Sequence, residues 1–553
     1  MYYHQNPYMR NTIFVLLTLA VNFLFSSCAV SCMQSKPGSV TESLKVRDAE
    51  QLVTLGAGEG TEFIVADTID LHGGNAKLPA NVLLTFRRGG AIVNGTLTGN
   101  GTGINAKGEN VLGVKLKGSW CVDVIYDMAF SRQYLNDRDI IENLNVIQSD
   151  SVRNEVFITR DYTVTIPHAS GSGLRPSSNS TFHITGDLTV APNDYKSYGV
   201  IEINKKENVS IKGGRIIGDC AEHDYIEGSS SEWGMGLNIK ESRNVIVENL
   251  YITRCTGDGI YISGGNEPSV GIYDFASKNI TIKNVVCDDN RRQGMSIIHV
   301  DGLIVRDCSF INTGATMSTP PSAGIDIEPN VSNGRNMSVR NVVVDNCTVT
   351  GNKGSAIATN NTYEADGLRN YANILFSNCR TDGLLKAQSD DMTFRNCTFK
   401  EIRFAAVYAP THITMEDCTI SGGYGITLYV PTEKGVQSKD RLLALDFRGC
   451  TISTIEEETR TKALISCYKS YVPNLEYVRM ENCHLMIPKS KAAPYYLTDY
   501  DFKGKLHISA STIDMQGVEL KADGVVLDGN RILCAKVFKS PEGSRNKITS
   551  IEQ

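Results

Sequence analysis

A short alternation of apolar and polar residues returns roughly ten times between residues 200 and 515. Each unit contains one alternating strand, a turn built from Asn, Asp or Gly, and a second alternating strand, as in Asn208–Ile216, Asn244–Ile252 and Asn279–Cys287. Such strands have a period of two and carry one apolar face. Because a single unit cannot bury that face alone, a period of about 18 to 35 residues predicts a solenoid of stacked coils.

The repeat predicts an all-β fold, a single right-handed parallel β-helix with an N-terminal capping segment; the hand follows from the usual crossover between parallel strands. The expected organisation is a signal peptide at 1–28, a tether at 29–45, a cap with the first coils at 46–200, the β-helix at 201–535 and a C-terminal tail at 536–553. A helix is expected where Asn136 or Asp137 supplies an N-cap and acids fill the first turn.

The N-terminus carries an apolar run from Ile13 to Phe25, preceded by Arg10. The run suits a signal-peptide core and is too short for a membrane span. It ends in Leu24-Phe25-Ser26-Ser27-Cys28, which resembles the lipobox of bacterial lipoproteins in the Bacteroides-type form with Ser before the Cys. The resemblance implies that Cys28 is lipidated and that the protein is exported and membrane-anchored, at the outer membrane or cell surface. A cleaved secretory peptide with an incidental Cys28 is the alternative.

Cysteines recur at one position of the repeat, directly after the Asn, Asp or Gly of the turn. The position is filled by Cys308, Cys347, Cys379, Cys397, Cys418, Cys450 and Cys483. Equivalent positions of neighbouring coils stack about 4.8 Å apart, and a thiol packs as a small buried apolar group. The pattern predicts a ladder of free thiols, and the absence of a CxxC or Cys/His ligand spacing predicts no metal site.

The overall charge narrows the choice of partner. A net charge of -6 and a pI near 5.9 argue against nucleic acid, which favours a basic face. A neutral or weakly charged ligand is expected instead.

The predicted helix and the strand pair at 155–164 resemble the entry to the pectate-lyase-like and tailspike-like families of right-handed parallel β-helices. The repeats between 46 and 535 resemble their coils, so the resemblance implies the fold and a polysaccharide or oligosaccharide partner. The catalytic motifs do not match: neither the Asn-Thr-Asp and Gly-His-Gly set of polygalacturonases nor the Tyr-Asp-Pro-His of alginate epimerases is present. The fold therefore follows from the resemblance and the activity does not.

The coils between 219 and 361 gain loops and a second line of strands, each opening with Gly or Ser. If their aliphatic residues point inward, one polar row points outward. This row contains Asn238, Tyr261, Ser296 and Asp326. A ligand groove along the row is therefore expected.

Groups able to do chemistry gather around this row. The candidate catalytic residues are Asp258, Asp326, Glu328 and Arg292, and the candidate substrate-binding residues are Tyr261, Asn238, Ser296, Trp233, His223, Glu232, Arg291 and His299. Asp326 and Glu328 are roughly 6.5 to 7 Å apart along one strand, and the levels of Asp258 and Asp326 differ by two coil steps of roughly 9 to 10 Å in total. Inverting glycosidases hold their carboxylates about 6.5 to 9.5 Å apart. In the plainer alternative, Asp258 serves a Gly-Asp-Gly turn and Asp326 pairs with Arg292.

Three classes of function remain open. Hydrolysis by paired carboxylates is favoured and needs no cofactor. A polysaccharide lyase or uronate C5-epimerase would use the Arg, Tyr or His residues, with a calcium ion possible in a lyase. A non-catalytic glycan-binding or adhesin-like protein would stack sugars on aromatic rings such as Trp233 and Tyr261.

Overall fold

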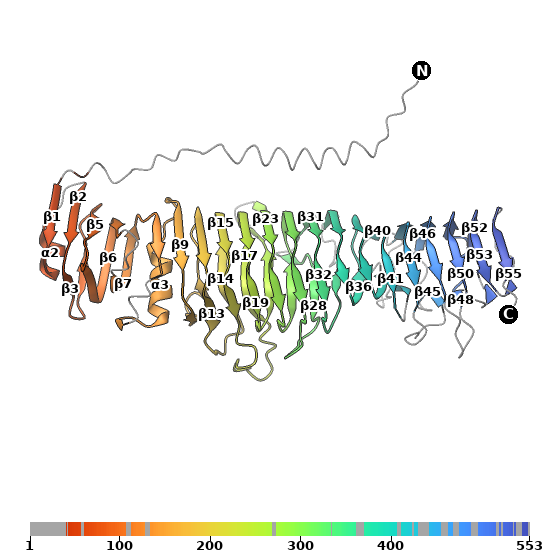
Figure 1. Ribbon diagram of the computed structural model, residues 1–553, viewed down its shortest axis with the longest axis horizontal. Helices are drawn as coiled ribbons and strands as arrows, with labels where there is room; N and C mark the ends of the chain where they lie inside the picture. The colour runs from red at the N-terminus through yellow and green to blue at the C-terminus, as the bar shows by residue number, and fades with distance from the viewer. Residues whose placement is uncertain are drawn as a thin grey trace, which may run out of the picture.

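A computed structural model shows an elongated rod with its strands lying across the long axis (Figure 1). It describes residues 40–550 except 41, 57–59, 107–111, 128–132, 268–271, 333–334, 361–369, 406–410, 423–424, 430–441, 455–462, 468–474, 488–495, 516–518, 521, 523, 535 and 538–544. Cys28, the predicted site of lipidation, lies outside the described residues. No helix among the described residues is long and apolar enough to cross a membrane.

Three long parallel sheets run the length of the rod and form the walls of a right-handed β-helix. The first sheet has 15 strands, from β10 (Tyr162–Val164) to β55 (Lys547–Ser550). The second has 12, from β11 (Ser172–Leu174) to β48 (Tyr496–Thr498). The third has 15, from β8 (Val124–Tyr126) to β52 (Val525–Asp528). The predicted all-β solenoid is confirmed, and its first sheet continues past residue 535, where the repeat pattern had suggested a tail.

Asparagines near the start of successive strands of the third sheet adopt a left-handed backbone. Asn208, Asn244 and Asn279 all have φ between 55° and 58°, the left-handed region that Asn tolerates better than most residues. Their side chains form a ladder, in which Asn244 donates to Asn208 at 3.0 Å and Asn279 donates to Asn244 at 3.2 Å. The asparagine at this position is therefore fixed both by its backbone conformation and by stacking.

The cysteine ladder is present as predicted. Its seven members are buried and free. Each thiol lies against main-chain carbonyl groups, as where the Sγ of Cys308 approaches the oxygen of Arg306 at 3.1 Å. The residue before each cysteine, such as Asp307, has a positive φ, which explains why that position alternates among Asn, Asp and Gly.

The N-terminal end has its own seven-stranded sheet, formed by β1 (Glu42–Val46), β2 (Thr61–Val65), β3 (Thr68–Asp70), β4 (Asn75–Lys77), β5 (Leu83–Phe86), β6 (Ala91–Asn105) and β7 (Leu112–Trp120). Helix α3 (Asp137–Ile147) begins after Asn136, which caps it as expected and accepts the Asp139 N–H. The short helix α2 (Ala49–Thr54), capped by Asp48, was not predicted, because six residues are too few to show a helical period.

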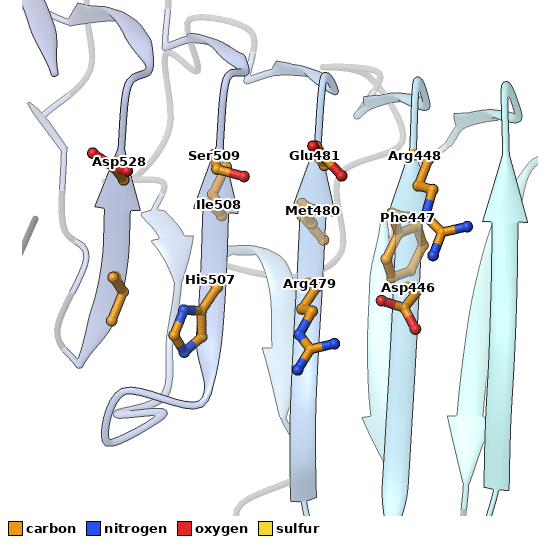
Figure 2. A pocket seen from close by; sticks show the side chains of 11 residues that line it. Asp446, Phe447, Arg448, Arg479, Met480, Glu481, His507, Ile508, Ser509 and Asp528 are labelled. Carbon is orange, nitrogen blue, oxygen red and sulfur yellow. The ribbon is translucent and has the colours of Figure 1, made fainter. Parts of the chain in front are cut away.

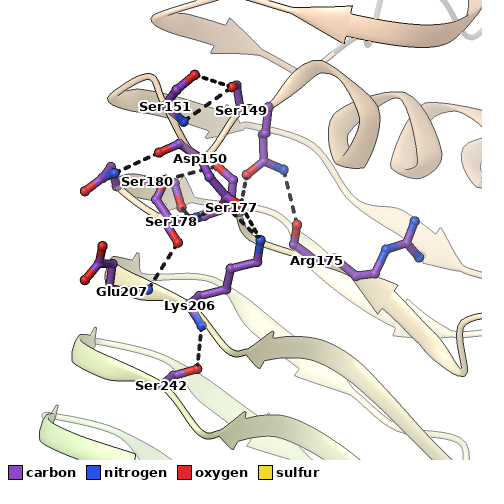
Figure 3. A network of polar contacts seen from close by, with 12 residues as sticks. Ser149, Asp150, Ser151, Arg175, Ser177, Ser178, Ser180, Lys206, Glu207 and Ser242 are labelled. Carbon is purple, nitrogen blue, oxygen red and sulfur yellow. Dashed lines mark hydrogen bonds and ion pairs between the residues drawn. The ribbon is translucent and has the colours of Figure 1, made fainter. Parts of the chain in front are cut away.

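A polar network follows α3 and fastens it to the first coils (Figure 3). Asp150 accepts hydrogen bonds from the Ser178 N–H at 2.6 Å and from the Lys206 Nζ at 2.8 Å. The Lys206 N–H in turn donates to the Ser242 hydroxyl at 3.1 Å. The network thus joins turns of successive coils and makes the start of the β-helix rigid.

Candidate functional site

The outward row predicted from the alternation lies on the second sheet. It spans β17 (Trp233–Lys240), β20 (Asp258–Ser263), β25 (Gln293–Ile297) and β28 (Ala323–Ile327). Asn238 pairs with Tyr261, Tyr261 with Ser296, and Ser296 with Asp326. The residues on either side of each, such as Ile325 and Ile327, are fully buried in the core. The structure differs in one respect, since Ser296 and Asp326 are only 1% exposed instead of solvated.

Asp258 lies three positions before this row. It pairs in register with Gln293, and Gln293 pairs with Ala323. Two strand steps and three residues along the strand place the Cα atoms of Asp258 and Asp326 about 14 Å apart, not the 9 to 10 Å expected from coil steps alone. Ser296 connects the two acids. Its hydroxyl donates to Asp258 at 2.6 Å, and its partner in register on the adjacent strand is Asp326.

A buried ion pair holds Asp258. The Arg292 Nη1 lies 3.1 Å and 3.3 Å from the two carboxylate oxygens, and Asp258 is fully buried. Burial raises the pKa of Asp258 to about 6, while the charge of Arg292 and the hydrogen bonds from Ser296 and Arg292 oppose a larger rise. Asp258 is therefore largely ionised at neutral pH. The alternative pairing of Arg292 with Asp326 is not formed.

Asp326 has the opposite environment. Gln293 donates from Nε2 to one carboxyl oxygen at 2.8 Å, and the other oxygen, Oδ1, is buried without a hydrogen-bond partner. Burial, and then the charge of Glu328, raise the pKa of Asp326 to about 8. Asp326 is therefore protonated at neutral pH, beside an ionised Asp258. Pairs of carboxyl groups with separated pKa values are the usual basis for assigning acid and base roles.

Aromatic rings cover the ion pair. The Arg292 guanidinium lies 5.0 Å from the ring centre of Trp233, and the Trp233 ring meets that of Tyr261 edge-on at 6.0 Å. Trp233 remains 38% exposed, so it offers a surface on which a sugar can stack. Burial, and then the charge of Asp258, raise the pKa of the Tyr261 phenol, so the phenol stays protonated at neutral pH and little phenolate is present to act as a base.

Two further predicted acids border the site. Glu328 follows Asp326 by two residues and is half-buried, with its N–H donating to Ile297 O at 3.0 Å. Glu232 precedes Trp233 and is also half-buried. Burial lowers the pKa of Arg292, but Asp258 and Glu232 outweigh it and raise that pKa overall. Both acids therefore shape the electrostatics of the buried groups.

Three of the predicted substrate contacts are engaged elsewhere. The Arg291 Nη1 donates to the carbonyls of Ser230 and Thr256 at 3.0 and 3.1 Å, and so fixes the segment that leads to Trp233. His223 is buried and its Nδ1 lies 2.9 Å from the carboxylate of Asp219. His299 is also buried, with its Nδ1 3.0 Å from Ser338 O. The sequence shows the residue types but not which neighbour each side chain meets.

Gln293 is expected beside the row because it precedes Gly294, but the sequence assigns it no role in the site. It pairs with Asp258 in register, and it holds Asp326 through Nε2 while its Oε1 accepts the Ala323 N–H at 2.9 Å. The sequence feature that indicates a role for Gln293 is its position directly before Gly294, which matches the position of Asp258 directly before Gly259.

A surface hollow of about 430 Å³ lies far from these residues, on the third sheet (Figure 2). Strands β43 (Leu443–Arg448), β46 (Leu475–Glu481), β49 (Leu506–Ser509) and β52 line it. Opposite charges face each other there, with Asp446 opposite Arg479, and Asp446 also accepts from Tyr477 at 3.1 Å. Such cross-strand pairs stabilise a sheet. We therefore place the candidate site at the buried carboxyl pair and not in this hollow.

No group of three or more His, Cys, Asp or Glu side chains among the described residues is arranged to hold a metal ion.

Comparison with known proteins agrees with the fold. A family model described as "Right handed beta helix region" matches residues 153–333, the coils that carry the candidate site up to β28. The "SPbeta prophage-derived uncharacterized protein YorA" of Bacillus subtilis (strain 168) is 35% identical over 172 residues. That match covers 30% of this chain and 29% of YorA, so the chain spans less than a third of this curated relative.

Solved structures with a similar fold have low sequence identity to this chain. The A-module of the mannuronan C-5 epimerase AlgE6 of Azotobacter vinelandii is 12% identical with a TM-score of 0.41, over 72% of this chain and 91% of that one. The tailspike gp49 of the Acinetobacter baumannii bacteriophage Fri1, a capsular polysaccharide depolymerase, is 12% identical with a TM-score of 0.36, over 78% of this chain and 65% of that one. The class that fold and site define is a right-handed parallel β-helix with a partly buried, polar row of side chains on its second sheet.

Proposed function

We propose that this chain is a carbohydrate-active β-helix protein that cleaves a polysaccharide by hydrolysis. The observation that carries the proposal is the pair Asp258 and Asp326, two buried carboxyl groups whose surroundings leave one ionised and the other protonated near neutral pH. Hydrolysis of a glycosidic bond needs one carboxylic acid to protonate the leaving oxygen and one carboxylate to activate water.

Each carboxyl group has a role in this proposal. Asp326 is the general acid, and its Oδ1, which is buried without a hydrogen-bond partner, would be the oxygen that protonates a glycosidic oxygen. Asp258 is the general base, oriented by Arg292 and Ser296. Glu328 keeps the proton on Asp326, because its charge raises the pKa of that group. Trp233 and Tyr261 would stack on the sugar rings.

Elimination and epimerisation have less support. Of the residues predicted for these reactions, Arg291 holds main-chain carbonyls and Arg292 holds Asp258, so neither of these arginines is free to neutralise a substrate carboxylate. His223 and His299 are buried and hydrogen-bonded, and the phenol of Tyr261 has a raised pKa. A calcium ion would enter only in the lyase alternative. A purely glycan-binding protein would have little use for a buried acid with a raised pKa.

The place of action belongs to the same proposal. The apolar run before Cys28 supports export and anchoring through a lipid on that cysteine, at the outer membrane or cell surface. A hydrolase held there would meet polysaccharide outside the cell.

The experiment compares wild type with the Asp326→Asn and Asp258→Asn variants on a panel of polysaccharides, and Asp187→Asn on the first sheet is the matched control. New reducing ends without absorbance near 235 nm, lost in both site variants and kept in the control, are the expected result. Absorbance at 235 nm would mean elimination. Binding of a polysaccharide with no product at all would mean a glycan-binding protein.

A further inference from the structure

The outward row continues past Asp326 and changes its charge. Asp326 pairs with Ala358 of β33 (Ile357–Thr359), Ala358 with Lys386 of β36 (Leu384–Ala387), and Lys386 with Arg403 of β39 (Glu401–Ala405). The strand neighbours of both cations, such as Leu385 and Ile402, are buried in the core. Two cations therefore follow the candidate acid on one face of the second sheet.

Among the residues that the structure describes, neither cation forms an ion pair, although Glu401 lies two residues before Arg403 on the same strand. The Lys386 Nζ donates to the Oδ1 of Asn360 at 3.1 Å, a neutral acceptor. Asn360 is itself fixed, because its N–H donates to Ile327 O at 2.9 Å and its carbonyl accepts the Tyr371 hydroxyl at 2.5 Å. Lys386 is half-buried and Arg403 is exposed. The ammonium group is thus positioned without its charge being cancelled.

Two like charges on adjacent strands are an unfavourable arrangement. Equivalent positions are about 4.8 Å apart, and like charges directly opposite each other destabilise a sheet. A bound anion would remove this repulsion. The field also reaches the candidate acid: the charge of Lys386 lowers the pKa of Asp326, against the larger effects of burial and Glu328. Two strand steps, roughly 9 to 10 Å in total, separate Lys386 from Asp326 along the row, a span that one oligosaccharide can cover.

We propose that Lys386 and Arg403 form a subsite for an anionic substituent, a carboxylate or a sulfate, on a polysaccharide that lies along this row. The inference rests on the proposed function and adds the class of substrate. It replaces the expectation of a neutral or weakly charged ligand drawn from the net charge of -6, because the charge along one row differs from that of the whole molecule.

The test measures the affinity of the whole protein for two pairs of polymers. Polygalacturonate is compared with its full methyl ester, which removes the carboxylates, and dextran sulfate is compared with dextran, which lacks the sulfates. Wild type is compared with the double variant Lys386→Gln/Arg403→Gln, and Arg380→Gln, an exposed arginine on β35 (Arg380–Thr381) of the first sheet, is the matched control.

Wild type and control should prefer the acidic member of at least one pair, and the double variant should lose roughly tenfold or more in affinity for it, the size of one charge-assisted hydrogen bond. The pair that shows the effect tells carboxylate from sulfate. Equal or better binding of neutral polymers, or an acidic preference that survives in the double variant or falls equally in the control, would overturn the subsite and leave the proposed function standing. If the protein binds none of these polymers, the subsite is wrong, and the cleavage assay above decides the function separately.

Discussion

Replacement of Asp326 by Asn should stabilise the protein while removing its proposed acid. The folded-state pKa of Asp326 is about 8, against roughly 3.9 for an unfolded Asp. Above pH 3.9 the unfolded chain ionises this group while the folded protein keeps it protonated, so its contribution to stability is complete below pH 3.9 and is lost as the pH rises through about 8. At 1.36 kcal/mol for each pH unit, the loss is on the order of 1 to 2 kcal/mol at pH 5 and about 4 kcal/mol at pH 7.

Asparagine has the shape of a protonated Asp and does not titrate, and its carbonyl oxygen can accept the bond from Gln293. Urea unfolding followed by circular dichroism measures the unfolding free energy of variant and wild type at pH 5 and pH 7. The difference, variant minus wild type, should be larger at pH 7 than at pH 5 by roughly 2 to 3 kcal/mol. Glu328→Gln is the matched comparison: it removes a charge that raises the pKa of Asp326 and should give a smaller gain of the same sign. A variant that is destabilised equally at both pH values would refute the assignment of Asp326 as a buried neutral acid.

Three other predictions follow from single residues. Arg291→Gln removes the bonds to main-chain carbonyls before Trp233, so the emission of Trp233, one of only two tryptophans, should shift to the red; unchanged emission would contradict that role for Arg291. Asp258→Asn leaves a buried guanidinium without its counter-ion and should cost about 3 to 5 kcal/mol in unfolding free energy, whereas a loss below about 1 kcal/mol would argue against a buried ion pair. Cys28→Ser should release the protein from the membrane fraction or leave its precursor unprocessed, and persistence of processed, membrane-bound protein would disprove the lipid anchor.

Local pattern was enough to predict the coils. The alternation around Asn244 fixes which side chains enter the core, and the need for a left-handed turn residue explains the Asn, Asp or Gly before each cysteine. The outward row of Asn238 to Asp326 follows from the same alternation, since stacking places equivalent positions side by side. These features depend only on neighbouring residues and on the repeat.

The geometry of the site could not be predicted from the repeat, because it depends on strand register, side-chain direction and burial. The offset of Asp258 from the outward row is a matter of register between strands, and the choice of Arg292 for Asp258 depends on side-chain direction. Ser296 and Asp326 are buried although the alternation points them outward, and it is chiefly this burial that raises the pKa of the acid. Arg291 and Arg292 are adjacent and chemically identical, yet one fixes a loop and the other an acid.

The pH dependence of kcat/KM on a cleaved polysaccharide tests the central claim most directly, because it reports the ionisation of the free enzyme. Activity should require Asp258 ionised, with a pKa of about 6, and Asp326 protonated, with a pKa of about 8. The account predicts a bell-shaped profile with its maximum near pH 7, and an Asp326→Asn variant that loses the alkaline limb together with on the order of a hundredfold in rate. A rate that keeps rising beyond pH 9, or full activity in that variant, would contradict catalysis by this carboxyl pair.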